Sequence, residues 1–378
     1  MKRGAIATLG TLASLVIITW GIILFAKGYR IDFLRKEVRR TGMISVRSYP
    51  DGAKVYLNGE LVAVTDDSIA SLKPGRYHLE IRKEGFTVRE KEVPVFEELV
   101  TDIEALLISR TPRLEPLTQT GARSPALSSS RDKIAFFSPG GEKSGLKMLT
   151  LSWDAPLNLF RATSPLLLQD TPSTVFSIGE KILWAPDDSS LLIQMNERGF
   201  YELPLNQSRN GREPLATSSA EPALSQWGEK IEDQRILFLE KKQIRPDLAQ
   251  TAIAPPTLWS PDEQKFLFKK ETEGKIEYRV YSLEDPLPVG AERETTALRV
   301  DPDSDIKVSW FSSNNHLILV EGSGTVSLIE IDGGNRTEVF TGTLASRNVF
   351  PTPAGDKLII LTTFNPNEEP NLYAVGLR

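Results

Sequence analysis

The pattern of hydrophobic and polar residues divides the chain into three regions. An apolar stretch without a charged residue runs from Ala5 to Ala26. Residues 42–108 alternate apolar and polar side chains in short runs, and residues 117–378 contain longer apolar runs that follow polar turns. Alternation with a period of two predicts β-strands that are buried on one face. We therefore expect one hydrophobic helix followed by two β-sheet domains.

The apolar stretch is long enough to cross a membrane, because about 20 apolar residues in a helix span the hydrocarbon core. A cleaved signal peptide and a buried helix are the alternatives. The apolar part of a signal peptide is usually shorter, and the residues around Ala26 match its cleavage site poorly. The sequence favours a transmembrane helix over residues 5–26, preceded by a cytoplasmic stub of residues 1–4.

The basic residues on either side of this stretch indicate the opposite membrane orientation, with the N-terminal stub outside the cytoplasm. Two Lys or Arg residues precede it and six follow it before residue 41, so the positive-inside rule would place the C-terminal body in the cytoplasm. Residues 27–41 form a basic connector. Its residues Phe33, Leu34 and Val38 either lie along the membrane surface or continue the helix into solvent.

Residues 42–108 predict a small antiparallel β-sandwich. The two-residue turn Asn58-Gly59 lies between the alternating runs 54–57 and 60–64. Both positions of such a turn accept a positive φ, which makes Asn-Gly a strong local signal for a β-hairpin. Another turn lies at Pro74-Gly75, and about six or seven strands fit into the region.

These turns carry a recognisable motif. Pro50-Asp51-Gly52-Ala53 resembles the Pro-Glu-Gly-Ala motif of the PEGA domain, and Asn58-Gly59 and Pro74-Gly75 follow it in the family's order. Asp51 replaces the usual Glu, but either carboxylate accepts hydrogen bonds from backbone N–H groups in a turn. The resemblance implies a non-catalytic β-sandwich module of prokaryotic envelope and surface-layer proteins. It therefore favours a body outside the cytoplasmic membrane.

A repeated corner organises residues 117–378. Trp184-Ala185-Pro186-Asp187 and Trp259-Ser260-Pro261-Asp262 each place an aromatic ring before a Pro-Asp turn and an apolar run. Pro and Asp favour the backbone angles of a tight turn, so each copy predicts two strands joined by a reversal. Looser copies begin at Leu127, Trp227, Trp310 and Pro351.

The spacing of the copies indicates a fold. The anchors between residues 127 and 351 recur at a mean interval of about 45 residues, which is the length of a four-stranded propeller blade. Helical repeats of this length would show a period of 3.6, which we do not detect. The corner resembles that of TolB-like and WD40-like β-propellers. This resemblance implies an all-β protein whose residues 117–378 form a propeller of about six blades.

Three further segments join or interrupt the predicted strands. Residues 109–116 are punctuated by Pro and predict a stiff linker. Phe96 to Ile108 fits either the last strand of the sandwich or the outer strand that closes the propeller. Asn206 to Pro222 and Glu284 to Asp305 are rich in Pro, Ser and charge, so we expect them to be insertions that bind the ligand.

Charge and composition exclude some classes of function. The net charge is −5 although the first 40 residues are basic, so the remaining body is acidic and does not suit a nucleic acid. The chain contains no Cys, which removes disulfides, thiolate metal sites and a Cys nucleophile. We expect no cofactor and no metal.

Candidate chemistry is sparse. His78 and His316 are the only histidines and fall in different predicted domains, so neither a catalytic triad nor a multi-His metal site is expected. Residues 301–305 begin like a calcium loop, but Ile306 and Ser312 stand where the pattern needs Gly and Glu. The repeated Trp residues fit packing between blades better than stacking on a sugar.

These observations predict a single-pass membrane protein of the cell envelope that binds a protein or glycan through its propeller and uses the PEGA-like module as a spacer. We expect no enzymatic activity. The alternatives are an envelope hydrolase or lyase on a propeller scaffold, which would need two converging carboxylates, and a surface-layer component that associates with itself.

Overall fold

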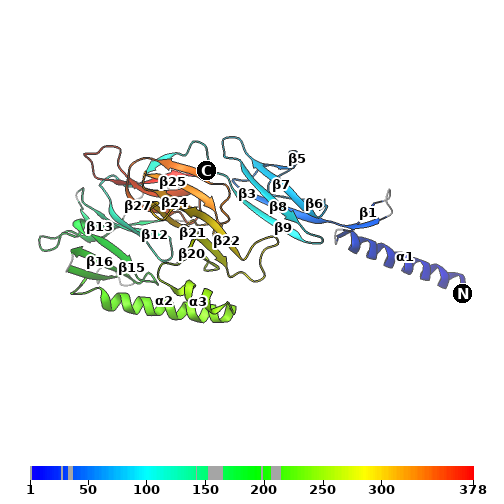
Figure 1. Cartoon of the computed structure of the whole chain (residues 1–378), viewed down its shortest axis with the longest axis horizontal. Helices are drawn as coiled ribbons and strands as arrows, with labels where there is room; N and C mark the ends of the chain where they lie inside the picture. Colours follow the sequence, from blue (N-terminus) through cyan, green and yellow to red (C-terminus); the bar gives the residue numbers. More distant parts are fainter. Residues whose placement is uncertain are drawn as a thin grey trace. The chain divides into compact units, whose positions relative to one another are not determined.

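The computed structural model describes residues 2–26, 29–32, 37–141, 143–151, 165–196, 199–205 and 214–378. It divides into two compact units (Figure 1). The first unit contains residues Met1–Arg110 and Glu284–Glu292, and the second contains Thr111–Leu283 and Arg293–Arg378.

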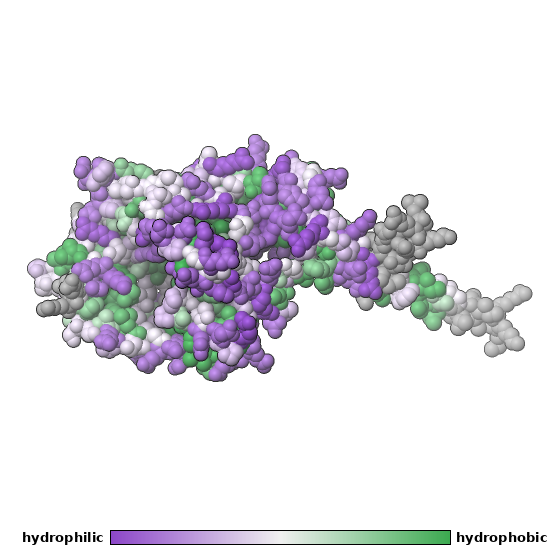
Figure 2. Space-filling model, viewed as in Figure 1, coloured by the Kyte–Doolittle hydropathy of each residue, from purple (hydrophilic) through white to green (hydrophobic). Residues whose placement is uncertain are grey.

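The N-terminal region is a helix followed by a two-stranded hairpin. Helix α1 spans Lys2–Ala26, and its apolar side chains between Leu12 and Ile23 are exposed, which Figure 2 shows as a green surface. Within the described part of the chain, no helix meets the length and hydropathy needed for a membrane span, so the predicted span stays a prediction.

The connector that follows α1 is not a continuation of the helix. Strand β1 (Tyr29–Asp32) pairs antiparallel with β2 (Glu37–Arg40), and Ile31 lies opposite Val38. The alternative that the helix continues through residues 27–41 is therefore wrong for Tyr29–Asp32 and Glu37–Arg40, which are strands. Phe33 and Leu34, which were expected at a membrane surface, lie outside the described residues.

Residues 42–106 fold into two packed sheets. One sheet has the order β6-β3-β9 and the other β5-β4-β7-β8. Alternate residues of these strands, such as Ile44, Val55, Leu79 and Ile81, are fully buried in one core. The strand bounds are Gly42–Tyr49 (β3), Lys54–Leu57 (β4), Glu60–Val64 (β5), Asp67–Leu72 (β6), Gly75–Arg82 (β7), Arg89–Val95 (β8) and Val100–Leu106 (β9).

Strand β9 settles the two interpretations of residues 96–108. It pairs in parallel with β3, from Met43 opposite Val100 to Tyr49 opposite Leu106. The segment thus supplies a strand of the sandwich and does not close the propeller.

Among its described residues, the second unit contains five four-stranded antiparallel sheets, where about six blades were expected. We name them blade 1 (β11–β14), blade 2 (β15–β18), blade 3 (β19–β22), blade 4 (β23–β26) and blade 5 (β27, β28, β29 and β10). Adjacent blades share apolar cores, such as Phe137 of blade 1 with Leu191 of blade 2. Blades 3 and 4 share a core through Leu267 and Leu317, and blades 5 and 1 through Ile359 and Phe136.

The strand bounds of blades 1 and 2 are Arg123–Leu127 (β11), Lys133–Ser138 (β12), Gly145–Thr150 (β13), Leu166–Gln169 (β14), Lys181–Trp184 (β15), Ser190–Asn196 (β16), Gly199–Pro204 (β17) and Leu215–Thr217 (β18). A short 3-10 helix, η2, covers Phe176–Ile178. The strand bounds of blades 3 and 4 are Leu258–Trp259 (β19), Lys265–Thr272 (β20), Lys275–Ser282 (β21), Glu294–Val300 (β22), Ile306–Trp310 (β23), His316–Glu321 (β24), Thr325–Glu330 (β25) and Thr337–Thr341 (β26).

Blade 5 joins the two ends of the propeller sequence. Its strands are β27 (Leu344–Pro351), β28 (Lys357–Thr362) and β29 (Asn371–Gly376), and β10 (Leu114–Pro116) pairs with β29 from Leu114 opposite Val375. The last three residues of the predicted linker 109–116 therefore form a strand. Pairing the first strand with the last closes the ring, which leaves fewer exposed sheet edges.

Two helices lie between blades 2 and 3 in the sequence, where a further repeat was expected. Helix α2 covers Glu221–Lys242 and helix α3 covers Pro246–Ile253. The proposed corner at Trp227 is wrong, because this residue lies inside α2. Pro222 in the first turn and apolar residues at positions 224, 227 and 231 are signals of a helix that the sequence contained.

Candidate functional site

The five blades share one type of corner, which we define as the six residues that join the innermost strand to the second. In blade 3 the N–H of Ser260 donates to the carbonyl of Lys265 at 2.9 Å, and the N–H of Glu263 donates to the carbonyl of Ser260 at 2.9 Å. Blades 1, 2 and 5 repeat both bonds, and blade 4 repeats the first. The corners begin at Ser128, Ala185, Ser260, Phe311 and Thr352.

The fourth residue of each corner has a left-handed backbone. Its φ is +62° at Arg131, +55° at Asp188, +56° at Glu263, +58° at Asn314 and +63° at Gly355. Only blade 5 has the Gly that this conformation favours. The other four blades have a non-Gly residue here, which adopts this conformation at an energetic cost. The contacts of their side chains offset that cost in two blades.

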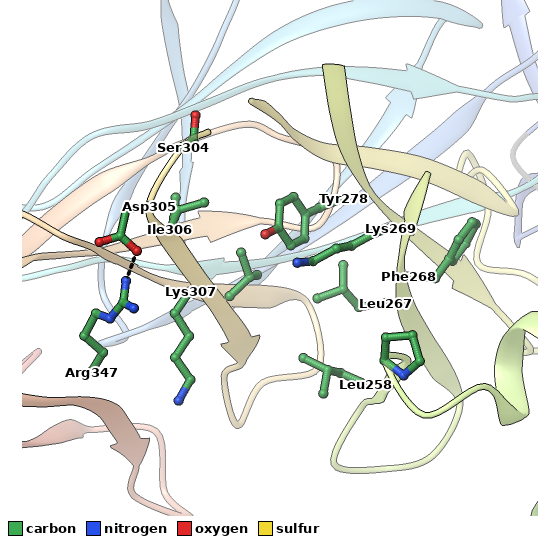
Figure 3. Close-up of a pocket in the computed structure, with 12 residues that line it drawn as sticks. Leu258, Leu267, Phe268, Lys269, Tyr278, Ser304, Asp305, Ile306, Lys307 and Arg347 are labelled. Carbon is green, nitrogen blue, oxygen red and sulfur yellow. Dashed lines mark hydrogen bonds and ion pairs between the residues drawn. The ribbon is translucent and has the colours of Figure 1, made fainter. Parts of the chain in front are cut away.

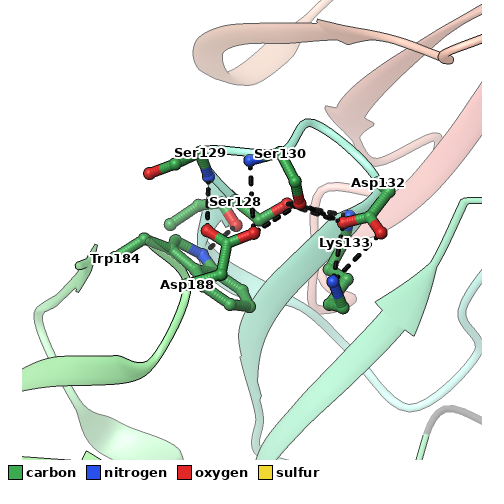
Figure 4. A network of polar contacts seen from close by, with 8 residues as sticks. Ser128, Ser129, Ser130, Asp132, Lys133, Trp184 and Asp188 are labelled. Carbon is green, nitrogen blue, oxygen red and sulfur yellow. Dashed lines mark hydrogen bonds and ion pairs between the residues drawn. The ribbon is translucent and has the colours of Figure 1, made fainter. Parts of the chain in front are cut away.

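Two of these side chains tie their corner to the preceding blade. The carboxylate of Asp188 accepts from the N–H of Ser129 at 2.8 Å and from the N–H of Ser130 at 3.2 Å, as Figure 4 shows. The amide oxygen of Asn314 accepts from the N–H of Asp262 at 3.2 Å. Corner-to-corner bonds thus fix blade 2 to blade 1 and blade 4 to blade 3.

The repeated Trp residues make a second set of bonds between blades. The indole N–H of Trp184 donates to the carbonyl of Ala126 at 3.0 Å, and that of Trp310 donates to the carbonyl of Leu258 at 2.8 Å. Both acceptors lie on the innermost strand of the preceding blade. These rings therefore join blades, as the sequence indicated.

Trp259 makes the same bond to a helix. Its indole N–H donates to the carbonyl of Ala252 in α3 at 2.9 Å, and its ring packs with Phe238 of α2 and Phe266 of blade 3. The ammonium of Lys230 in α2 pairs with Asp187 of the blade 2 corner at 2.9 Å. Helices α2 and α3 therefore occupy the position of a blade between blades 2 and 3.

Three cavities formed by described residues lie along the innermost strands of the blades. One of about 460 Å³, which we call the corner cavity, is lined by the corners of blades 1 and 3 and by residues of α2, β19, β23 and β27. A second, of about 640 Å³, lies along β11, β15 and β27. The third, of about 390 Å³, lies between blades 3 and 4 (Figure 3).

Strand β27 contributes to all three cavities because its pairing with β28 is irregular. Ser346 lies opposite Leu361 and Phe350 lies opposite Ile359, so β27 has extra residues between these two pairs. Its residues Arg347, Asn348 and Val349 line the cavity walls. A bulge of this kind redirects side chains and leaves backbone groups without a ladder partner.

Positive charge predominates in the corner cavity. Arg131, Arg235 and Lys307 line it, and Glu263 is its only carboxylate among the residues described. Burial lowers the pKa of the Arg131 guanidinium, and it also lowers that of Arg235, although the charge of Glu263 opposes this second shift. Burial and the nearby Arg347 lower the pKa of Lys307. Arg131 and Arg235 are half-buried, whereas Lys307 is exposed.

The corner residues named from the sequence are structural. Pro186 and Pro261 occupy the second corner position. Asp187 accepts from the hydroxyl of Ser189 at 2.5 Å and pairs with Lys230, and the first of these bonds in particular lowers its pKa. Asp262 accepts from the hydroxyl of Ser260 at 2.5 Å and from the N–H of Gln264 at 3.0 Å.

The PEGA-like motif forms a tightly bonded turn in the first unit. The hydroxyl of Thr65 accepts from the N–H of Ala53 at 2.9 Å, and the carbonyl of Pro50 accepts from the hydroxyl of Ser48 at 2.7 Å. The Asp51 carbonyl accepts from Lys83, and Gly52 has a φ of +69°. These contacts give the motif a structural role.

The other predicted turns lie where the pattern placed them. Asn58 and Gly59 have φ of +50° and +86° between β4 and β5, and the side-chain oxygen of Asn58 accepts from the N–H of His78 at 2.9 Å. Pro74 and Gly75 precede and begin β7. The histidines lie in different units, and His316 is buried beside Ser313 at 2.8 Å.

The suggested calcium loop is occupied by ion pairs. Asp301 lies 3.1 Å from the ammonium of Lys275, and Asp305 pairs with Arg347 (Figure 3). Within the described ranges no group of three His, Asp or Glu side chains is arranged to hold a metal.

Regular elements take up parts of both expected binding segments. Residues 206–213 lie outside the described part of the chain, and β18 and the start of α2 occupy residues 215–222. Strand β22 covers Glu294–Val300 within the segment 284–305. The sequence did not point to Arg131, Arg235 or Lys307, because they come together only in the folded ring.

Comparison with solved structures gives distant similarities. The crystal structure of TolB from Acinetobacter baumannii is 15% identical, with a TM-score of 0.26, and the match covers 80% of this chain and 60% of that one. An oligogalacturonate lyase in complex with manganese is 10% identical, with a TM-score of 0.25, and the match covers 84% of this chain and 82% of that one. No curated protein sequence matches the chain.

Comparison with protein families gives a specific result for the first unit. The family described as the PEGA domain matches residues 41–109. This range begins at β3 and extends past β9, so it covers both sheets of the sandwich. Residues 41–109 are therefore a PEGA domain.

Proposed function

We propose that the protein is a membrane-anchored binding protein of the cell envelope. In this proposal the cavities along the innermost propeller strands hold a protein or glycan ligand, and the PEGA domain is a spacer. The carrying observation is the corner cavity, which combines Arg131, Arg235 and Lys307 with the rings of Trp259 and Trp310. Its volume of about 460 Å³ falls in the range of ligand sites, about 300–1,000 Å³.

The anchor in this proposal is helix α1. Large apolar side chains point outward all along its described part, from Leu12 at 66% exposed to Ile23 at 47%. A helix that is apolar on all sides needs an apolar environment. The N-terminus then lies in the cytoplasm and the body outside, which suits the PEGA domain.

The distribution of carboxylates favours binding over hydrolysis. Each cavity wall described contains a single carboxylate: Glu263, Asp305 or Glu180. Asp305 is already paired with Arg347. Glycoside hydrolysis commonly uses two carboxyl groups that flank the scissile bond, and no lining above provides such a pair.

Site-specific photocrosslinking in cells tests the binding role. A benzoylphenylalanine at Asn348, which lines two cavities, should form an adduct of defined mass with an envelope protein or glycan. Thr296, an exposed residue of the outer strand β22, is the control position. An adduct that forms equally from both positions, or from neither, would contradict the proposal.

Protease treatment of intact cells tests the location. Degradation of the propeller from outside, with the N-terminus protected, is expected. Protection in intact cells followed by cleavage after lysis would place the body in the cytoplasm. Solubility of the whole chain after alkaline extraction would argue against the anchor.

A further inference from the structure

The cations of the corner cavity have few partners within the fold. Among the described residues, no carboxylate lies within ion-pair distance of Arg131 or Arg235, although the structure contains many surface ion pairs such as Lys230 with Asp187. Arg235 instead lies over the ring of Trp259, 5.2 Å from its centroid. The ammonium of Lys307 donates to the amide oxygen of Asn348. A cation that is partly desolvated and lacks a carboxylate is a favourable partner for an anion from outside.

Arg235 reaches the corner cavity from a helix and not from a blade. Arg235 belongs to α2, the helix that fills the position of a blade. Glu263 occupies the same corner position as Asp188 and Asn314, which bond to the preceding corner. Helix α2 stands in place of that preceding corner, so the cavity receives a guanidinium there. The helical insertion therefore changes the charge of the cavity as well as the architecture of the ring.

The walls also offer backbone groups. Strands β19, β23 and β27 are the innermost strands of their sheets and have a strand partner on one side only. The carbonyl of Leu258 in β19 already accepts from Trp310, and the N–H of Asn348 in β27 already donates to the hydroxyl of Ser346. Arg347, Asn348 and Val349 lie in the bulge of β27, between its pairs with β28. An open strand edge can pair with an extended peptide through main-chain hydrogen bonds. A glycan cannot supply this repeating pattern of donors and acceptors.

We propose that the corner cavity binds an extended acidic peptide segment of a partner protein, whose carboxylates contact Arg131, Arg235 and Lys307. Apolar residues of the same peptide then pack on Phe350 and on Leu258, which is 41% exposed and lines the same cavity. Acidic and apolar residues that alternate would suit it, because successive side chains of a strand point to opposite faces. This inference rests on the proposed function and adds the chemical class of the ligand.

Fluorescence anisotropy with the full chain in detergent tests the inference. The probe is a labelled octapeptide of alternating Glu and Leu, and its matched control is the Gln and Leu octapeptide. The acidic probe should bind at least about tenfold more tightly at low salt, and this preference should shrink at high salt because screening weakens charge contacts.

Variants identify the cations. Arg131→Gln and Arg235→Gln should each weaken binding of the acidic probe about tenfold, whereas Arg131→Lys should retain most of the affinity. Lys241→Gln, an exposed position of the same helix α2, is the matched control and should change nothing. An unchanged unfolding midpoint in Arg235→Gln separates lost contact from misfolding.

Each remaining outcome decides a specific point. Equal binding of the acidic and neutral octapeptides would overturn the charge assignment and leave binding in the cavity intact. Stronger binding by an oligomer of glucuronic acid than by the acidic octapeptide would overturn the peptide assignment. If no probe binds while Asn348 still forms its crosslink, this inference fails alone. If the crosslink is also absent, the proposed function fails with it.

Discussion

Two junctions of the propeller solve one packing problem with different elements. Between blades 1 and 2, Trp184 donates to the carbonyl of Ala126 on a strand. At blade 3, Trp259 donates to the carbonyl of Ala252 on a helix, at nearly the same distance. A sheet face needs an apolar cover and its Trp needs an acceptor, and the helices supply both.

The two junctions differ at the corner. The side chain of Asp188 holds the backbone of the preceding corner through two N–H groups. Glu263 occupies the equivalent position but has helix α2 beside it, and it lines the corner cavity. The helices thus cover the core of blade 3 as a blade would, but they leave Glu263 without a neighbouring corner to bond. Glu263 lines the corner cavity instead. The predictions below test this difference.

The largest effect is expected from the buried rings. Phe266 of blade 3 is 0% exposed beneath the helices, and Phe266→Ala should lower the free energy of unfolding by about 3–5 kcal/mol. Phe137→Ala, a matched change at the junction of blades 1 and 2, should cost a similar amount. Denaturant unfolding of the full chain in detergent measures both. A much smaller loss at Phe266 would mean that the helices cover blade 3 only loosely.

The helix itself provides an internal comparison. Leu239 is 4% exposed and belongs to the core of blade 3, whereas Leu237 is 59% exposed on the same helix. Leu239→Ala should therefore cost about 2–4 kcal/mol, and Leu237→Ala should stay within about 0.5 kcal/mol. The same unfolding measurement applies. Equal costs for the two changes would contradict the packing of α2 described above.

Substitutions of Asp188 and Glu263 should change the free energy of unfolding by different amounts at the two junctions. Asp188→Ala removes the acceptor of the N–H groups of Ser129 and Ser130, which are exposed, and should cost about 0.5–1.5 kcal/mol. Glu263→Ala removes no such bond and should leave stability nearly unchanged. Asp188→Asn keeps an acceptor and tolerates the left-handed backbone, so it should fall between them. If Glu263→Ala is as costly as Asp188→Ala, the corners are equivalent after all.

The smallest effect concerns pH at the contact between blade 2 and α2. Hydrogen bonds from Ser189 and Lys230 hold the pKa of Asp187 below its ordinary value, which is about 3.9. The unfolded chain therefore binds this proton more readily, so the stabilisation is present above pH 4 and is lost as pH falls through the lower folded pKa. Because this side chain is 49% exposed, the contribution should stay below about 1 kcal/mol.

Comparing the wild type with Asp187→Asn across pH measures this term. The difference in unfolding free energy should be constant above about pH 5 and shrink in more acidic solution. Lys230→Gln, which removes only the partner in α2, should produce part of the same change. A difference that grows as pH falls would have the wrong sign.

The local signals of the chain were sufficient for much of the fold. Asn58-Gly59 and the Pro-Asp corners at Pro186 and Pro261 fix reversals through backbone preferences that do not depend on distant residues. Period-two alternation placed residues such as Val55 and Leu79 in one sheet face. The four-residue apolar run 236–239 was different, because a run this short fits a strand or a helix equally.

The sequence alone determined the sandwich, the repeated corners and the apolar N-terminal helix, since each depends on neighbours along the chain. Only the tertiary structure decided that five sheets and two helices share the ring, and that Arg131, Arg235 and Lys307 face one cavity. These cations come from a corner, a helix and a strand that are distant in sequence, and their meeting depends on which surfaces bury one another.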